Sequence, residues 1–114
     1  MLNHVVMLKF KPGVEETDIK ELEEMLDDLP NKITEIHSYE FGRNTIHSQK
    51  SFDFALVSLF ANDIALKRYQ DHRQHLPVLK KIKALCETVA TVDFQGSDAG
   101  STDIERPIWD FKPI

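Results

Sequence analysis

The sequence is short of cysteine, of basic residues and of long apolar runs, and each shortage removes a class of protein. Cys86 is the only cysteine, so the chain has no intrachain disulfide and no cysteine-rich metal site. The 114 residues include 14 Lys and Arg against 19 Asp and Glu, a formal net charge of -5. Because no clustered basic stripe stands out, we expect no nucleic-acid partner.

Apolar stretches such as residues 55–57 fall far short of the roughly 20 residues that cross a bilayer, so we expect no membrane contact. Lys9 and Lys11 follow the first apolar run instead of preceding it, which argues against a signal peptide. The sequence also lacks a Gly-rich phosphate loop and a nucleophile elbow, so nucleotide binding and acyl-enzyme chemistry are not indicated. These features favour a cytoplasmic protein.

Alternation of apolar and polar residues predicts four strands, over residues 2–10, 33–41, 53–60 and 89–94. Helical spacing from Ile19 to Leu29 predicts a first helix, which we expect Pro30 to stop. Asn62 or Asp63 can cap a short second helix, and a third is predicted over residues 76–86.

The element order β, α, β, β, α-α, β predicts an α+β fold, a split βαβ sandwich with helices on one face of a four-stranded antiparallel sheet. We assign residues 1–95 to this domain. Residues 96–114 are predicted to be a Gly- and Ser-containing linker and a tail. The tail carries Ile108, Trp109 and Phe111, and either docks on the body or a twin subunit, or is disordered.

The predicted sheet has a second apolar face. Ala55, Val57 and Leu59 lie opposite the main apolar side of the third strand, and Val5 and Met7 do the same in the first. A solvated face would alternate cleanly, so this one requires a cover. We expect a second copy of the chain, packed sheet to sheet as a homodimer; the alternative is that the tail folds back over the face.

Candidate chemistry gathers around Tyr69, His72 and His75, which the fold can bring near His4 and Asp93. Histidine exchanges protons near neutral pH, and a tyrosine hydroxyl can donate a hydrogen bond to an oxygen that develops negative charge. By strand parity, His4 lines a pocket between sheet and helices. The structural alternative is that Tyr69 buries its ring in the core while His72 and His75 cap helices or lie on the surface.

His72, His75 and a carboxylate can also be read as zinc or iron ligands. The neighbouring positive charge of Arg73 disfavours a dication, and a third ligand has to come from an unknown distance. We therefore expect no metal and no other cofactor.

Several motifs resemble the stress-responsive dimeric A/B barrel domain (Dabb) family over residues 2–94. The matching stretches are His4-Val5-Val6, Lys9-Phe10-Lys11 with the Pro-Gly-Val turn, residues 41–44, residues 55–60, Tyr69-Gln70-Asp71-His72 with His75, and Val92-Asp93-Phe94. The resemblance implies a ferredoxin-like monomer whose sheet pairs with that of a twin to close a dimeric α+β barrel. Many members are known only as stress-induced proteins, so the fold transfers better than the function.

The family includes a plant polyketide cyclase that needs no cofactor and closes a poly-β-ketone by aldol condensation. Carried over by resemblance, His75 is the general base, Asp93 orients its imidazole and Tyr69 steadies the enolate oxygen. His4 and His72 line the pocket, and His72 also shapes the turn.

At Arg73 the chain departs from the family, because many members carry proline at this position. The turn can therefore differ, and with it the direction in which the His75 side chain points. Three functions follow. The chain is a dimer that binds a small apolar keto compound, as a binding protein or as a cofactor-independent cyclase or lyase. Alternatively it is a non-catalytic stress protein whose dimer is its function, or, by analogy of fold, a cofactor-free monooxygenase.

Overall fold

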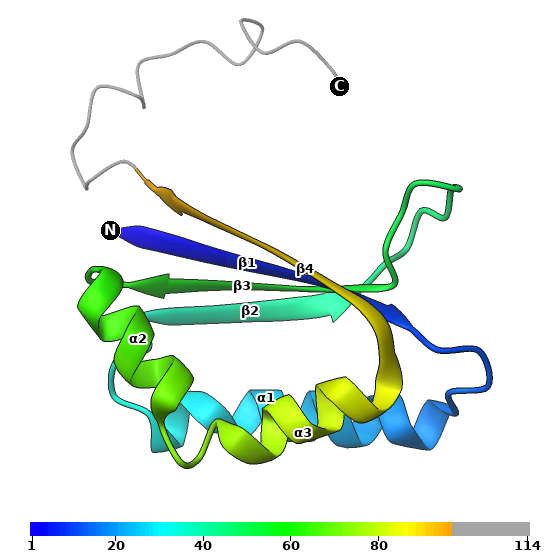
Figure 1. The fold of residues 1–114 in the computed structure, drawn as a ribbon, viewed down its shortest axis with the longest axis horizontal. Coiled ribbons are helices and arrows are strands. Elements are labelled where there is room, and N and C mark those ends of the chain that lie inside the picture. The colour runs from blue at the N-terminus through cyan, green and yellow to red at the C-terminus, as the bar shows by residue number, and fades with distance from the viewer. Residues whose placement is uncertain (97–114) are drawn as a thin grey trace, which may run out of the picture.

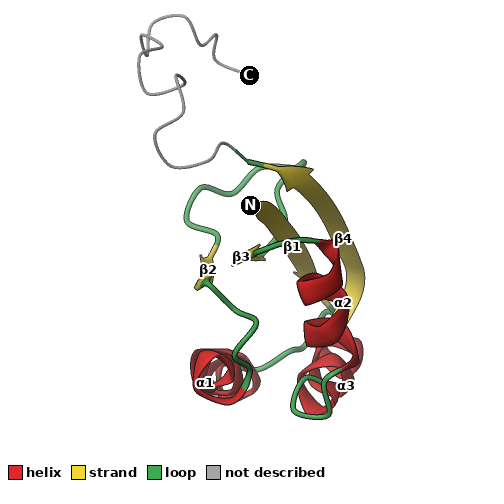
Figure 2. Ribbon diagram, turned by 90° about the vertical axis from the view of Figure 1, so that its left-hand side faces the viewer, coloured by secondary structure: helices red, strands yellow, loops and turns green. Residues whose placement is uncertain are grey.

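The computed structural model describes residues 1–96, which form one sheet with three helices on a single face (Figures 1 and 2). The elements in chain order are β1 (Leu2–Phe10), α1 (Glu16–Lys32), β2 (Ser38–Arg43), β3 (Phe54–Phe60), α2 (Asp63–Asp71), α3 (Leu76–Leu85) and β4 (Cys86–Gln95). This arrangement is the predicted α+β, ferredoxin-like split βαβ sandwich. None of the helices in the described part is long and apolar enough to span a membrane.

The sheet is antiparallel with strand order β2-β3-β1-β4, so β1 is a central strand that pairs on both sides. In register, Val5 lies opposite Val57 of β3 and Val92 of β4. Because side chains alternate along a strand, His4 and its partner Asp93 point to the other face, which the helices cover. The pairing therefore places residues from both ends of the domain side by side.

Two predicted boundaries around α1 are wrong. Pro30 lies inside the helix, which ends at Lys32. A proline so close to the C-terminus removes one hydrogen bond of the last turns, and the N–H of Ile33 still donates to the carbonyl of Leu29 at 2.9 Å. Ile33 is fully buried at the end of the helix, so residues 33–37 belong to the connection and β2 begins only at Ser38.

The second half of the chain follows the prediction more closely. Asn62 caps α2, because its side-chain oxygen accepts the N–H of Ala65 at 2.9 Å. The third helix stops one residue early, at Leu85, and β4 begins at once with Cys86. The last strand is therefore three residues longer at its start than the alternation of residues 89–94 predicts.

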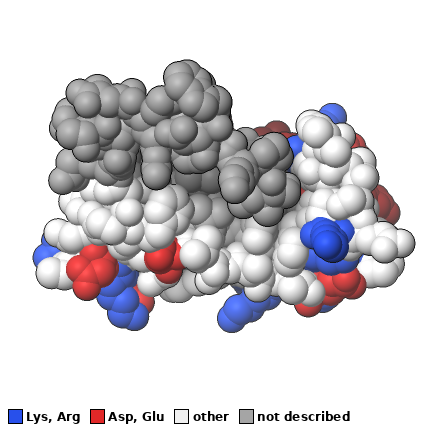
Figure 3. Space-filling model, turned by 90° about the horizontal axis from the view of Figure 1, so that it is seen from above, with Lys and Arg blue, Asp and Glu red and all other residues white. Residues whose placement is uncertain are grey.

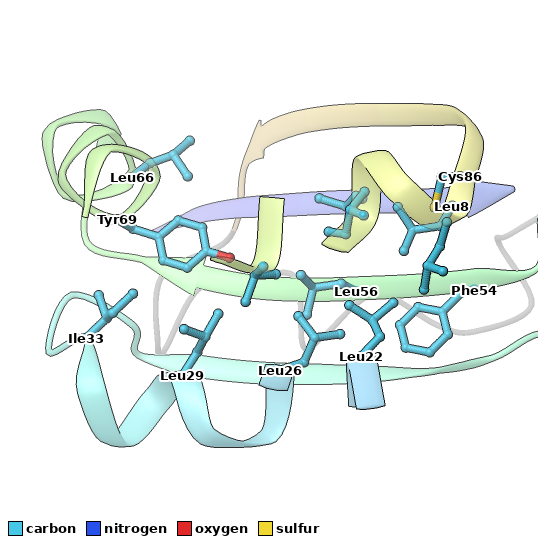
Figure 4. Close-up of a cluster of buried hydrophobic side chains, with 14 of the residues drawn as sticks. Leu8, Leu22, Leu26, Leu29, Ile33, Phe54, Leu56, Leu66, Tyr69 and Cys86 are labelled. Atoms are coloured by element: carbon cyan, nitrogen blue, oxygen red, sulfur yellow. The ribbon is translucent and has the colours of Figure 1, made fainter. Parts of the chain in front are cut away.

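The core lies between the helices and the sheet, and Figure 4 shows its leucines and aromatic rings meeting from both layers. Nearly inaccessible members include Leu22, Leu26 and Leu29 of α1, Leu8 of β1, Phe54 and Phe60 of β3, and Tyr69 of α2. Within residues 1–96, no helix covers the other side of the sheet, which we call the open face (Figure 2). Figure 3 looks onto this side, where much of the visible described surface is uncharged.

The open face is apolar, as predicted. Val57 is 43% exposed, Val92 52% and Phe94 50%, and Met7 of β1 is exposed as well. The tail hypothesis for Trp109 and its neighbours concerns residues outside the described part of the chain.

Candidate functional site

A cavity of about 250 Å³ lies between the sheet and the helices, over β1 and β4 and beside α3. Its lining comprises His4, Val6, Leu26, Leu56, Tyr69, Gln70, His75, Val78, Leu79, Ile82, Val89 and Thr91. Most of these side chains are apolar, and none belongs to Lys, Arg, Asp or Glu. Three of the five predicted site residues, His4, Tyr69 and His75, line this space.

The segment between α2 and α3 aims His75 at the cavity. The N–H of His72 donates to the carbonyl of Tyr69 at the end of α2, and the His72 carbonyl accepts the N–H of His75 at 2.9 Å. The Nδ1 atom of His72 also accepts the N–H of Gln74 at 3.0 Å. His72 thus shapes the turn, as the resemblance implies. It was also predicted to line the pocket, but it is not among the residues that line this cavity.

His75 is 7% exposed, and its ring packs against that of Tyr69 with centroids 4.3 Å apart. Its Nδ1 lies 3.2 Å from the carbonyl oxygen of Gln70. A carbonyl only accepts, so Nδ1–H donates and the lone pair of the neutral imidazole resides on Nε2. Burial lowers the pKa of His75, and positive charge on His4 and His72 adds to this effect. His75 is therefore a neutral acceptor at physiological pH.

Asp93 binds His4 instead of His75. The two residues are direct partners in the β1–β4 register, and the carboxylate Oδ1 accepts the Nδ1–H of His4 in a short hydrogen bond. His4 is buried, whereas Asp93 is partly exposed at the edge strand. The predicted orientation of His75 by Asp93 is wrong in this structure, because the strand register gives the carboxylate a nearer imidazole.

Tyr69 has a partner that the sequence argument missed. Its hydroxyl oxygen lies 2.7 Å from that of Tyr39 on β2. Burial raises the pKa of Tyr69 to about 12 and raises that of Tyr39 still further, so both hydroxyls keep their protons. The alternation of side chains along β2 could have predicted this contact, because it places Tyr39 and Phe41 on the face that the helices cover.

Within residues 1–96, no three His, Cys, Asp or Glu side chains gather in a way that can hold a metal ion. The cavity itself offers two imidazoles, one phenol, one amide and one hydroxyl among apolar side chains. This set suits proton transfer and hydrogen bonding with an uncharged ligand, because the lining has no formal charge to balance an ion.

A larger recess of about 500 Å³ lies beside the loop of residues 44–53, near Arg43 and Lys50. The guanidinium of Arg43 is already bound by Glu16 and Glu23, each with a nitrogen–oxygen distance of 2.7 Å. The recess contains no histidine or tyrosine, so the smaller cavity is the better candidate site.

Comparison with solved structures gives the same fold in several proteins. A dimeric ferredoxin-like protein of unknown function from Thermobifida fusca YX is 25% identical, with a TM-score of 0.75 over 82% of this chain and 88% of the other. A dimeric ferredoxin-like protein of unknown function from Bacteroides fragilis NCTC 9343 is 27% identical, with a TM-score of 0.74 over 83% and 95%.

The hydroxynitrile lyase from Passiflora edulis is 15% identical, with a TM-score of 0.76 over 88% of this chain and 96% of the other, which shows a shared fold alone. Comparison with curated proteins gives no significant match. The family model of the stress responsive A/B barrel domain matches residues 2–95, the same segment that builds the sheet, the helices and the cavity. The chain belongs to the stress responsive A/B barrel domain (Dabb) family.

Proposed function

We propose that this protein is a homodimer in which each subunit binds a small, mostly apolar carbonyl compound and removes a proton next to the carbonyl group, with His75 as the base. The observation that carries the proposal is the placement of His75. Its ring is buried and lines an apolar cavity, while its Nδ1–H is held by Gln70, so the basic Nε2 is left for a ligand.

The homodimer is supported by the open face of the sheet. Val57 and Val92 flank Val5 across the three neighbouring strands, so the exposed apolar residues are contiguous. A continuous apolar sheet face is typical of an interface, and a two-fold dimer covers the same face on both copies. The relatives from Thermobifida fusca and Bacteroides fragilis are described as dimeric.

The dimensions of the cavity limit the ligand. Its volume equals that of about eight water molecules at roughly 30 Å³ each, which is below the range of sites for drug-sized ligands. The lining is mostly apolar and has no formally charged carboxylate, ammonium or guanidinium group. The ligand is therefore small and uncharged, with one or two polar atoms facing the histidines and Tyr69.

Deprotonation beside a carbonyl group needs a base and a donor for the oxygen. His75 is uncharged at physiological pH because burial lowers its pKa, so it is ready to accept a proton. Tyr69 can receive a hydrogen bond from Tyr39 and donate its own proton to the carbonyl oxygen, which strengthens as that oxygen becomes an enolate. A protein whose only role is to dimerise does not need a cavity with this lining.

The test uses 2-tetralone, an uncharged bicyclic ketone, with the full-length protein in deuterium oxide. We expect its binding to shift the NMR signals of cavity residues and the protein to accelerate loss of the proton at the carbon next to the carbonyl group. In His75→Gln the exchange rate falls about a hundredfold, because general-base catalysis typically contributes this much. The matched control is His47→Gln, which alters an exposed histidine of the 44–53 loop.

Two outcomes contradict the proposal. Equal exchange rates in the wild-type protein and His75→Gln would show that His75 is not the base. Absence of any signal change in cavity residues at saturating 2-tetralone would show that the cavity does not take a ketone of this kind.

A further inference from the structure

The recess of about 500 Å³ beside the loop of residues 44–53 has its floor on the open face of the sheet. Gly42 pairs with Ala55 across β2 and β3, and Ala55 pairs with Met7 across β3 and β1. Residues that are paired across neighbouring strands share a face of the sheet. The recess is therefore separate from the cavity of His75 under the helices, and the two share no lining residue.

The hollow exists because two adjacent positions of its floor lack large side chains. Gly42 has no side chain, and a Cβ atom placed there would meet nothing within 4 Å. The backbone at this position does not require glycine either, because among the described residues only Gly13 has a positive φ. The neighbouring Ala55 contributes a single methyl group. The sequence thus leaves a space open that most strand residues would fill.

The wall of the recess is the loop between β2 and β3, which rises away from the helices (Figure 1). At its base, the N–H of Asn44 donates to the carbonyl of Asp53 at 2.8 Å. Further along, the hydroxyl of Ser51 accepts the N–H of Ser48 at 2.9 Å. The hydroxyl of Ser48 accepts the N–H of Lys50 at 3.3 Å. The loop that carries Lys50 is therefore held by its own hydrogen bonds.

The lining combines apolar atoms with one unbalanced positive charge. It contains two cationic side chains and no Asp or Glu. The guanidinium of Arg43 is bound by Glu16 and Glu23 of α1, whereas Lys50 has no ion-pair partner within residues 1–96. The carboxylate of Asp53, the nearest acid along the chain, accepts a main-chain N–H of β1 at 2.9 Å. The recess thus offers one ammonium group to an anion.

We propose that this recess is a second ligand site, which binds a small monocarboxylate with an apolar chain. The ammonium of Lys50 pairs with the carboxylate, and the apolar chain lies on Met7 and Ala55. One unpaired cation matches one negative charge, so a phosphate dianion is disfavoured. The volume falls within the range of about 300–1,000 Å³ that is typical of small-molecule sites.

This inference goes beyond the proposed function, because it involves no residue of the His75 cavity and no chemical step. It is also compatible with the homodimer. Ala55 is the second residue of β3, so the ligand lies at the end of the open face, whereas Val57 lies nearer its centre.

The test titrates hexanoate into the full-length protein and follows it by NMR. We expect shifts of the amide signals of Gly42 and Ala55 and of the Met7 methyl signal. Two further titrations separate the parts of the ligand: 1-hexanol has the apolar chain without the charge, and inorganic phosphate has charge without the chain. Each should bind about fivefold more weakly than hexanoate or less, because each makes only one of the two contacts.

Lys50→Gln should weaken hexanoate binding about fivefold, the effect of losing one solvent-accessible ion pair. The matched control is Lys67→Gln, which alters an exposed lysine of α2 at the opposite end of the sheet (Figure 1) and should bind as the wild type does. Gly42→Leu fills the floor and should weaken binding at least about tenfold. The open space at Gly42 admits the new side chain without a clash.

Unmoved signals of the recess at high hexanoate concentration would overturn the inference, and so would equal affinity in the wild-type protein and Lys50→Gln. Shifts confined to Leu79 and Ile82 would also contradict it, because these residues line the other cavity. Failure of the proposed function is a separate result, since it is read from 2-tetralone and from the signals of that cavity.

Discussion

Tyr39 of β2 and Tyr69 of α2 are joined through their hydroxyl groups, with the two oxygens 2.7 Å apart. Their rings meet edge to face, and the ring of Tyr69 also packs against Phe60 and His75. This bond ties an edge strand of the sheet to the helix that leads into the site. It therefore affects both the stability of the domain and the position of the Tyr69 hydroxyl.

Replacement of Tyr39 by phenylalanine should destabilise the domain by about 1–2 kcal/mol, because a buried hydroxyl loses its partner without gaining water. Urea denaturation measures the loss. The double variant Tyr39→Phe/Tyr69→Phe should cost less than the sum of the two single changes, by roughly 1 kcal/mol, since the second removal leaves nothing unpaired. Strictly additive costs would contradict a hydrogen bond between the two hydroxyls.

The stability of the domain should fall as the pH drops below about 6.5, the ordinary pKa of histidine. Burial lowers the pKa of His75 in the folded state, so the unfolded chain binds a proton more readily. The contribution of neutral His75 is fully present above the unfolded pKa and is lost as the pH falls toward the lowered folded value.

Urea denaturation at several pH values across this range measures whether the free energy of unfolding falls as the pH drops. Other ionisable groups of the chain also contribute to the pH dependence, so the informative quantity is the difference between variants. We expect His75→Gln to flatten the slope and His47→Gln to leave it unchanged. A slope in His75→Gln as steep as that of the wild type would assign the pH dependence to another group.

Substitution of Val57 by lysine should weaken self-association roughly a hundredfold, because a charge enters the apolar face that we propose as the interface. Val57 is 43% exposed and lies opposite Glu40 of β2, whose carboxylate can balance the new charge within one subunit. The subunit should therefore stay folded. Analytical ultracentrifugation measures the association, and circular dichroism checks the fold.

The control for this change is Ile64→Lys, at an exposed apolar position on α2 and away from the open face. It should leave the dimer intact. If both variants associate as the wild-type chain does, the open face of the sheet is not the interface.

Enlargement of Thr91 to phenylalanine should block the cavity and weaken 2-tetralone binding at least about tenfold. Thr91 lines the cavity yet is exposed on β4, so the larger side chain can enter the space without disturbing the core. Titration calorimetry measures the affinity. Thr91→Val keeps the volume and should bind normally; equal binding by both variants would locate the ligand elsewhere.

The sequence predicted the elements wherever one periodic pattern dominated. The apolar alternation of β3 located that strand and its two apolar faces, and Asn62 located the start of α2. Prediction failed where two rules competed. Pro30 reads as a stop signal, but the buried residues Leu29 and Ile33 on either side of it hold the last turn of α1 in place.

The candidate site was only partly predictable for a related reason. Because histidine and tyrosine occur together in one short segment, His75 and Tyr69 could be predicted as site residues. The alternation of side chains along the strand placed His4 on the face of β1 that the helices cover. The choice of partner for Asp93 depends on the register between β1 and β4, which a single sequence does not encode locally. Tyr39 was missed because its role is a contact with a helix that begins more than twenty residues later.

The position of β1 in the middle of the sheet governs when the site can form. This strand is the first to be synthesised, yet its two neighbours are β3 and β4, and β4 is the last element of the domain. Pairings between such distant segments form slowly, because a long loop must close before any contact compensates for the lost entropy. The bond between His4 and Asp93 spans nearly the whole domain, so this side of the cavity is absent from every partly made chain and appears only when the final strand docks.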